Sequence, residues 1–99
     1  MRQNRLWQEV VDGGYRIIMD RRIAILGIIV EDMDSVERVN ELLHEYREYI
    51  VGRMGMPYRE RGVSVISVVM DADTNTLSAL SGKLGMTPGV SAKAVYSKT

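Results

Sequence analysis

The sequence predicts an α+β fold in which strands and helices follow one another in the order β, α, β, β, α, β. Two almost wholly apolar runs, residues 23–30 and 63–70, suit strands in the middle of a sheet. A segment with helical periodicity follows each run. A polar turn containing Gly62 precedes the second run and indicates a hairpin. This order is that of the ferredoxin-like sandwich, a four-stranded antiparallel sheet with two helices on one face and its first and third strands in the middle.

Length and composition limit the class of protein. The chain has 99 residues, enough for one domain with a single core. Because 13 Lys and Arg balance 13 Asp and Glu, we expect no direct nucleic-acid binding. The absence of cysteine excludes thiolate catalysis, disulfides and cysteine-ligated metal centres in this chain. The longest apolar run is too short to span a bilayer and no signal peptide is recognised, so we expect no membrane association and a cytoplasmic location.

Residues 1–18 are predicted to be an N-terminal extension, and residues 19–99 the ferredoxin-like domain. The extension is either disordered or a short amphipathic helix with apolar residues on one side, namely Leu6, Trp7, Val10 and Val11. Gly13 and Gly14 can be encoded by GGAGGN, the purine-rich pattern of a bacterial ribosome-binding site, shortly before Met19. The hypothesis is that residues 1–18 are translated upstream sequence.

The first strand, residues 23–30, carries apolar side chains in both of its alternating sets. One set is Ile23, Ile25 and Ile29, and the other is Ala24, Leu26, Ile28 and Val30. Gly27 falls within the first set. Its lack of a side chain could accommodate a packed helix, which is the favoured interpretation, or admit a ligand.

The first helix is predicted to begin after Asp32 or Asp34, either of which can cap it, and to run to about Arg47. Its apolar side contains Val36, Val39, Leu43 and Tyr46, and its acidic side contains Asp34, Glu37, Glu41, Glu45 and Glu48. Glu41 and His44 have the Glu-x-x-His spacing of di-iron bundles, but those sites need the motif twice. We therefore predict no metal site and a solvated His44, and a site shared between subunits is the weaker alternative.

The remaining elements are a hairpin, a second helix and a last strand. Pro57 cannot donate a ladder hydrogen bond, so the strand over residues 50–56 is predicted at a sheet edge. The second helix, ending near Leu84, buries Leu77, Leu80 and Leu84. Gly82 suggests close packing on the sheet, Gly85 suits the position after the helix, and residues 90–96 form the last strand.

Helices on one face alone would leave the apolar residues of the other face exposed. Self-association is the usual remedy for such a patch, and it predicts a homo-oligomer, a dimer or a tetramer. Ile28 and Val65 are the candidate interface residues. Charged substitution should distinguish an interface position from a core position, because only the former would yield a folded monomer.

The runs RRIAILGIIVED, SVERVNELLHEY and above all GRMGMPYRERGVSVISVVMD are similar to those of the family of iron-only hydrogenase system regulators. The resemblance covers about residues 19–98. It implies a ferredoxin-like domain akin to ACT domains and to the C-terminal domain of the nickel-responsive regulator NikR, relatives that assemble through their sheets and bind effectors or metals at subunit contacts. It identifies neither a ligand nor a cofactor, and the several His and Cys that hold metal in NikR are missing here.

No catalytic motif is found, and we predict that the chain is not an enzyme. The sharpest candidate site is a basic cluster suited to a carboxylate or phosphate, formed by Arg53, Tyr58, Arg59 and Arg61. The competing interpretation is a solvated turn whose arginines discourage edge pairing or meet a neighbour's acidic helix.

Two classes of function follow. The first is a regulatory module that senses a small-molecule effector at a subunit interface. The second is a structural or interaction module that docks, through its open sheet or acidic helix, onto another protein, for example one of the hydrogenase system.

Overall fold

The computed structural model describes residues 21–98, so the extension predicted over residues 1–18 lies outside the described residues. The elements follow the predicted order, and short 3₁₀ turns lie at Met33–Ser35, Arg47–Tyr49 and Arg59–Arg61. The main elements are β1 (Arg21–Val30), α3 (Val36–Glu45), β2 (Ile50–Tyr58), β3 (Val63–Asp73), α4 (Thr74–Gly85) and β4 (Val90–Tyr96). Among the described residues, no helix has the length and apolar content required to cross a lipid bilayer.

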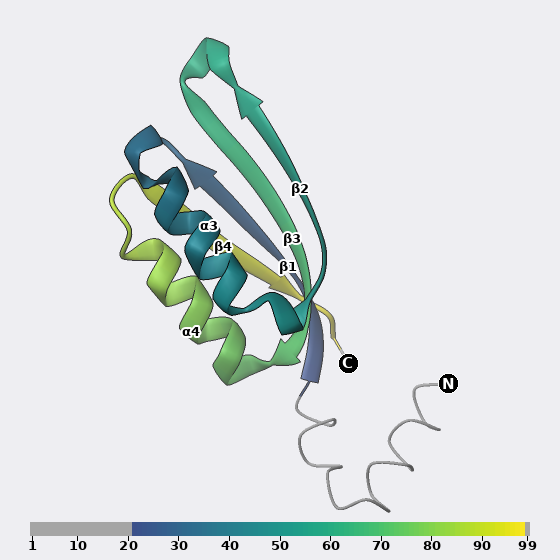
Figure 1. Ribbon diagram of the computed structural model, residues 1–99. Coiled ribbons are helices and arrows are strands. Elements are labelled where there is room, and N and C mark those ends of the chain that lie inside the picture. The colour runs from purple at the N-terminus through teal and green to yellow at the C-terminus, as the bar shows by residue number, and fades with distance from the viewer. Residues whose placement is uncertain (1–20, 99) are drawn as a thin grey trace, which may run out of the picture.

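The four strands form one antiparallel sheet in the order β2-β3-β1-β4. Both helices lie on the same side of this sheet (Figure 1), which confirms the ferredoxin-like arrangement with β1 and β3 in the middle. The prediction of β2 as an edge strand is also confirmed. The hairpin of β2 and β3 projects past the end of β1 (Figure 1). The pairing of β1 with β3 ends at Val30 and Ser64, whereas the pairing of β2 with β3 continues to Tyr58 and Val63.

The core lies between the helices and one face of the sheet. The two predicted sets of β1 do point to opposite faces: the set containing Leu26 is buried, whereas Ile23, Ile25 and Ile29 are 46%, 48% and 44% exposed. β3 alternates in the same way, with Val68 and Met70 fully buried. The buried core consists of Ala24, Leu26, Ile28, Val30, Val39, Leu42, Leu43, Ile66, Val68, Met70, Ala72, Leu77, Leu80, Leu84 and Val90.

The helices use the apolar sides that their periodicity predicts. In α3, Val39 and Leu43 are buried together with Leu42, and the helix ends at Glu45, two residues earlier than expected. Asp32 is the cap of the preceding 3₁₀ turn, where its Oδ1 accepts a hydrogen bond of 3.0 Å from the amide of Asp34. In α4 the three predicted leucines are buried.

Three glycine predictions are wrong. Gly27 alternates with Leu26, so it lies on the face without helices, and the nearest atom to a Cβ there would be the Lys93 carbonyl oxygen at 3.8 Å. Gly82 is exposed and has no neighbour within 4 Å of such a Cβ, so it does not pack on the sheet. Gly85 is the last residue of α4, and positive φ angles occur instead at Gly62 and Gly89.

Gly89 is where the loop before β4 meets the start of α3. Its φ is +69°, and a Cβ on it would lie 2.5 Å from the Cβ of Asp32, a separation that requires a rearrangement. The amide of Glu31 donates to the Gly89 carbonyl at 2.7 Å, and the buried Ser35 hydroxyl donates to the Pro88 carbonyl at 2.6 Å. These contacts fix the end of β1 and the start of α3 against the last loop.

Candidate functional site

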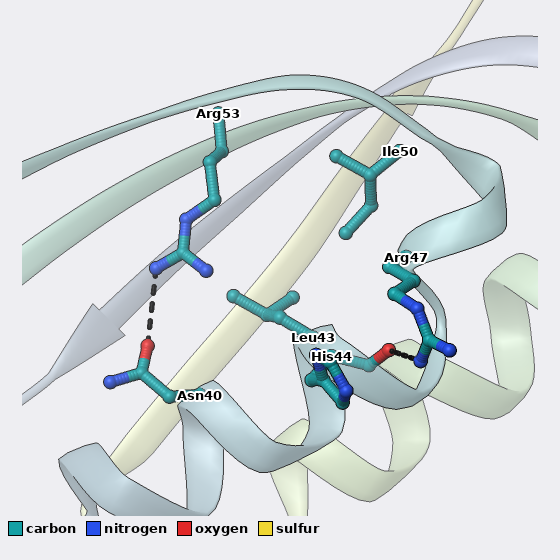
Figure 2. A pocket seen from close by; sticks show the side chains of 6 residues that line it. All are labelled: Asn40, Leu43, His44, Arg47, Ile50 and Arg53. Atoms are coloured by element: carbon teal, nitrogen blue, oxygen red, sulfur yellow. Dashed lines mark hydrogen bonds between the residues drawn. The ribbon is translucent and has the colours of Figure 1, made fainter.

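A pocket of about 310 Å³ lies between α3 and the beginning of β2. Figure 2 shows the six residues that line it: Asn40, Leu43, His44, Arg47, Ile50 and Arg53. Arg53 belonged to the predicted basic cluster, and His44 was considered only as a metal ligand, whereas Asn40 and Arg47 were not singled out for binding.

A β-bulge places the two β2 residues on the same wall. Ile50 pairs with Met70 and Arg53 pairs with Val68, and both partners are buried under the helices. Residues three apart in a regular strand face opposite sides of the sheet. The register shifts between Ile50 and Gly52, and this extra residue brings Ile50 and Arg53 to the α3 side together.

The opposite wall comes from α3 and the turn that follows it. Asn40, His44 and Arg47 are spaced by four and three residues, so they follow one side of the helix. Leu43, which is 1% exposed, lies between them and continues into the core. Leu43 and the half-buried Ile50 give the pocket an apolar floor below a polar rim.

The rim is held by two hydrogen bonds, both drawn in Figure 2. Arg53 Nη2 donates to Asn40 Oδ1 at 3.1 Å, which joins β2 to α3 across the pocket. Arg47 Nη1 donates to the carbonyl oxygen of His44 at 3.0 Å. Each guanidinium carries five N–H donors, so each keeps donors that these bonds do not use.

The pocket is positively charged because, among the described residues, Arg47 and Arg53 line it and no carboxylate does, and two acidic residues of α3 pair elsewhere. Glu41 lies 3.3 Å from Arg38, and Glu45 lies 3.9 Å from both Arg38 and Lys83. Tyr46, through hydrogen bonding and charge, raises the pKa of Lys83, whose ammonium lies 3.9 Å from Glu45. Within residues 21–98, Arg47 and Arg53 form no such ion pair.

The four residues of the predicted basic cluster are not brought together. Arg53 faces α3, whereas Tyr58, five residues further along the same strand, faces the side without helices. The five-residue spacing also places the Cα atoms of Arg53 and Tyr58 about 16 Å apart along the strand. Arg59 and Arg61 lie in the exposed turn at the hairpin tip. The spacing of Asn40, His44 and Arg47 along one side of α3 was the available signal for the helical wall alone.

The structure describes Glu41 and His44 as exposed residues of α3. Nowhere in residues 21–98 do three or more His, Asp or Glu side chains gather in a group that could hold a metal ion.

The second candidate site is the helix-free face, the side of the sheet opposite the helices. Strand pairing orders it into rows that cross the strands. One row runs Met56, Val65, Ile29 and Ser91, and another runs Gly52, Val69, Ile25 and Val95. The row between them consists of Met54, Ser67, Gly27 and Lys93, so small residues occupy its middle.

Of the two residues predicted at an interface, only Val65 lies on the helix-free face. Ile28 is fully buried under the helices, and its assignment to an interface is corrected. Both alternating sets of β1 are apolar, so their composition could not indicate which set the helices cover. The exposed large apolar residues of this face are Ile23, Ile25, Ile29, Met54, Met56, Tyr58 and Val95.

These features define a small ferredoxin-like domain with one uncovered sheet face and a basic pocket beside a helix. The chain belongs to the TM1266-like family, described as "Iron-only hydrogenase system regulator, putative", which matches residues 22–94 and confirms the resemblance seen in the sequence. It is similar to the solved structure of uncharacterized protein TM1266 from Thermotoga maritima, with 47% identity and a TM-score of 0.75 over 79% of this chain and 99% of that one.

A more distant structural likeness extends to a formyltetrahydrofolate deformylase from Pseudomonas putida KT2440. The identity is 18% and the TM-score 0.55, over 74% of this chain and 28% of that chain. At this identity the likeness shows the fold alone. A search of curated proteins found no match to the chain.

Proposed function

We propose that the chain is a non-enzymatic regulatory module of the iron-only hydrogenase system, which senses a small ligand and acts as a homo-oligomer joined through the helix-free face. Membership of the regulator family supports the role in that system. The observation that carries the assembly is the set of exposed apolar rows, in which Ile25 is 48%, Met56 60% and Val95 68% exposed. A contiguous apolar surface of this kind on a soluble domain marks an interaction site.

The dimensions of the helix-free face suit a second copy of the chain. Four strands spaced by about 4.8 Å and the ten-residue strand β1, rising about 3.4 Å per residue, give a face of about 600 Å². A standard interface buries about 600–1,000 Å² on each partner, so the face reaches the lower end of that range. The small residues Gly27 and Ser67 in the middle row allow the sheet of a second copy to approach closely. The flexible side chains of Met54 and Met56 can adapt to the surface of that sheet.

The test compares two aspartate substitutions. Val65→Asp places a charge on the helix-free face and should give a folded monomer, whereas Ile28→Asp places it in the core and should unfold the domain. Sedimentation velocity reports the oligomeric state, and circular dichroism reports folding. A folded Val65→Asp that keeps the wild-type oligomer would refute assembly through this face. A wild-type monomer would favour the other function, docking onto a different protein.

A further inference from the structure

We propose that the pocket between α3 and β2 binds a small organic carboxylate, with the carboxylate between Arg47 and Arg53 and an aliphatic portion over Leu43 and Ile50. This names the chemical class of the effector, and its regulatory meaning rests on the function proposed above. The pocket itself is built from the residues of one subunit, so binding does not depend on assembly.

The rim recognises an anion because it offers chiefly hydrogen-bond donors. Arg53 lies on the β2 wall and Arg47 on the α3 wall (Figure 2), and each retains N–H groups beyond its one observed bond. Asn40 Oδ1 already accepts from Arg53, so the amide nitrogen is the donor that Asn40 adds. A carboxylate supplies only acceptors and fits the guanidinium fork in two places, which makes it the complementary group.

Charge also favours an anion over a cation. Glu41 and Glu45, the carboxylates of α3 nearest His44 in sequence, lie within ion-pair distance of Arg38 and Lys83 instead. No ion pair links Arg47 or Arg53 to a carboxylate within the described part of the chain. A bound carboxylate can therefore interact with Arg47 and Arg53 without breaking an existing ion pair of the described residues.

The floor distinguishes an organic carboxylate from an inorganic anion. Half-buried Ile50, beside the almost fully buried Leu43, offers apolar surface that phosphate or acetate leaves uncovered. The volume, about 310 Å³, lies at the lower end of the range for small-molecule pockets. The ligand is therefore a compact metabolite with a short aliphatic chain.

Isothermal titration calorimetry on the full chain tests the proposal with acetate, butyrate, 4-methylpentanoate and the uncharged 4-methylpentanamide. Affinity should rise about two- to fourfold with each added methylene, because each one covers more of the floor. The amide should bind about tenfold more weakly than the acid, or not at all, because it carries no negative charge and offers one acceptor oxygen instead of two. Inorganic phosphate should bind more weakly than 4-methylpentanoate.

Substitutions assign the binding to this pocket. Arg47→Ala and Arg53→Ala should each weaken 4-methylpentanoate binding about tenfold or more, because each removes a charged donor. Arg59→Ala removes the same charge at the hairpin tip and should leave the affinity unchanged. Arg53→Lys keeps the charge without the fork and should fall between Arg53→Ala and the wild type.

Three results would overturn the proposal: no binding of 4-methylpentanoate, equal binding of acid and amide, or equal losses in Arg59→Ala and the pocket variants. Phosphate binding more tightly than every carboxylate would also overturn the ligand class. The titration is repeated on Val65→Asp to separate this proposal from the assembly. Retained affinity in a Val65→Asp monomer supports a pocket within one subunit, and lost affinity in that monomer refutes it, whatever the wild-type oligomeric state proves to be.

Discussion

Substitution of Gly89 by alanine should destabilise the domain strongly, because two separate costs coincide there. Its φ of +69° lies in the left-handed region, which costs an alanine about 1–2 kcal/mol. The new Cβ would also lie 2.5 Å from Asp32 Cβ and 2.8 Å from the Asp32 backbone nitrogen, so the start of α3 must move. With about 1–3 kcal/mol for that overpacking, the expected loss in the free energy of unfolding is about 2–5 kcal/mol.

Two other glycines are matched controls. Gly62 has φ of +66° but open space around a Cβ, so Gly62→Ala should cost only the backbone term of about 1–2 kcal/mol. Gly82 lies within α4 in open space, so Gly82→Ala should stabilise the domain by about 0.5–1 kcal/mol. Urea denaturation followed by circular dichroism, at one fixed protein concentration, measures all three. Equal losses for Gly89→Ala and Gly62→Ala would refute the close contact between Gly89 and Asp32.

Three further predictions concern a buried hydroxyl, the hairpin tip and the domain boundary. Ser35→Ala removes the donor to the Pro88 carbonyl and should lower the free energy of unfolding by about 1–3 kcal/mol in urea denaturation, whereas an unchanged value would show that the bond adds nothing. Replacing both Arg59 and Arg61 by alanine should change that free energy by less than about 0.5 kcal/mol, because both are exposed. The same variant should weaken self-association, since Tyr58 beside the tip lies on the helix-free face, and an unchanged sedimentation profile would remove the tip from the contact. A chain shortened to residues 19–99 should fold and assemble like the full chain, and a loss of several kcal/mol in stability would show that the omitted segment packs on the domain.

The fold was predictable from local signals that agree with one another. Two apolar runs, two helical periods and a polar turn with Gly62 leave few arrangements of six elements, and Gly62 adopts a left-handed conformation in that turn. The buried leucines of α4 followed directly from their spacing. These features depend on near neighbours in the chain, which a sequence displays.

The orientation of the sheet faces was less predictable. Ile25 and Ile28 are equally apolar, yet one is 48% exposed and the other fully buried. The difference arises from the side on which the helices pack, which no residue of the strand encodes by itself. The role of Gly27 was misread for the same reason.

The pocket depends on a feature that the residue types do not signal. Without the bulge between Ile50 and Gly52, Ile50 and Arg53 would face opposite sides of the sheet. Sequence reasoning therefore grouped Arg53 with the hairpin arginines, its neighbours along the chain. The structure instead places Arg53 beside Asn40 of α3, to which it donates a hydrogen bond.

Sedimentation equilibrium of the unmodified full chain at micromolar concentration measures whether copies of the chain associate, as the proposal for the helix-free face requires. We expect a mass at least twice the 11.2 kDa of one chain. The mass should fall toward that of one chain on dilution, because association follows mass action. A mass of one chain throughout the micromolar range would refute self-association through the helix-free face.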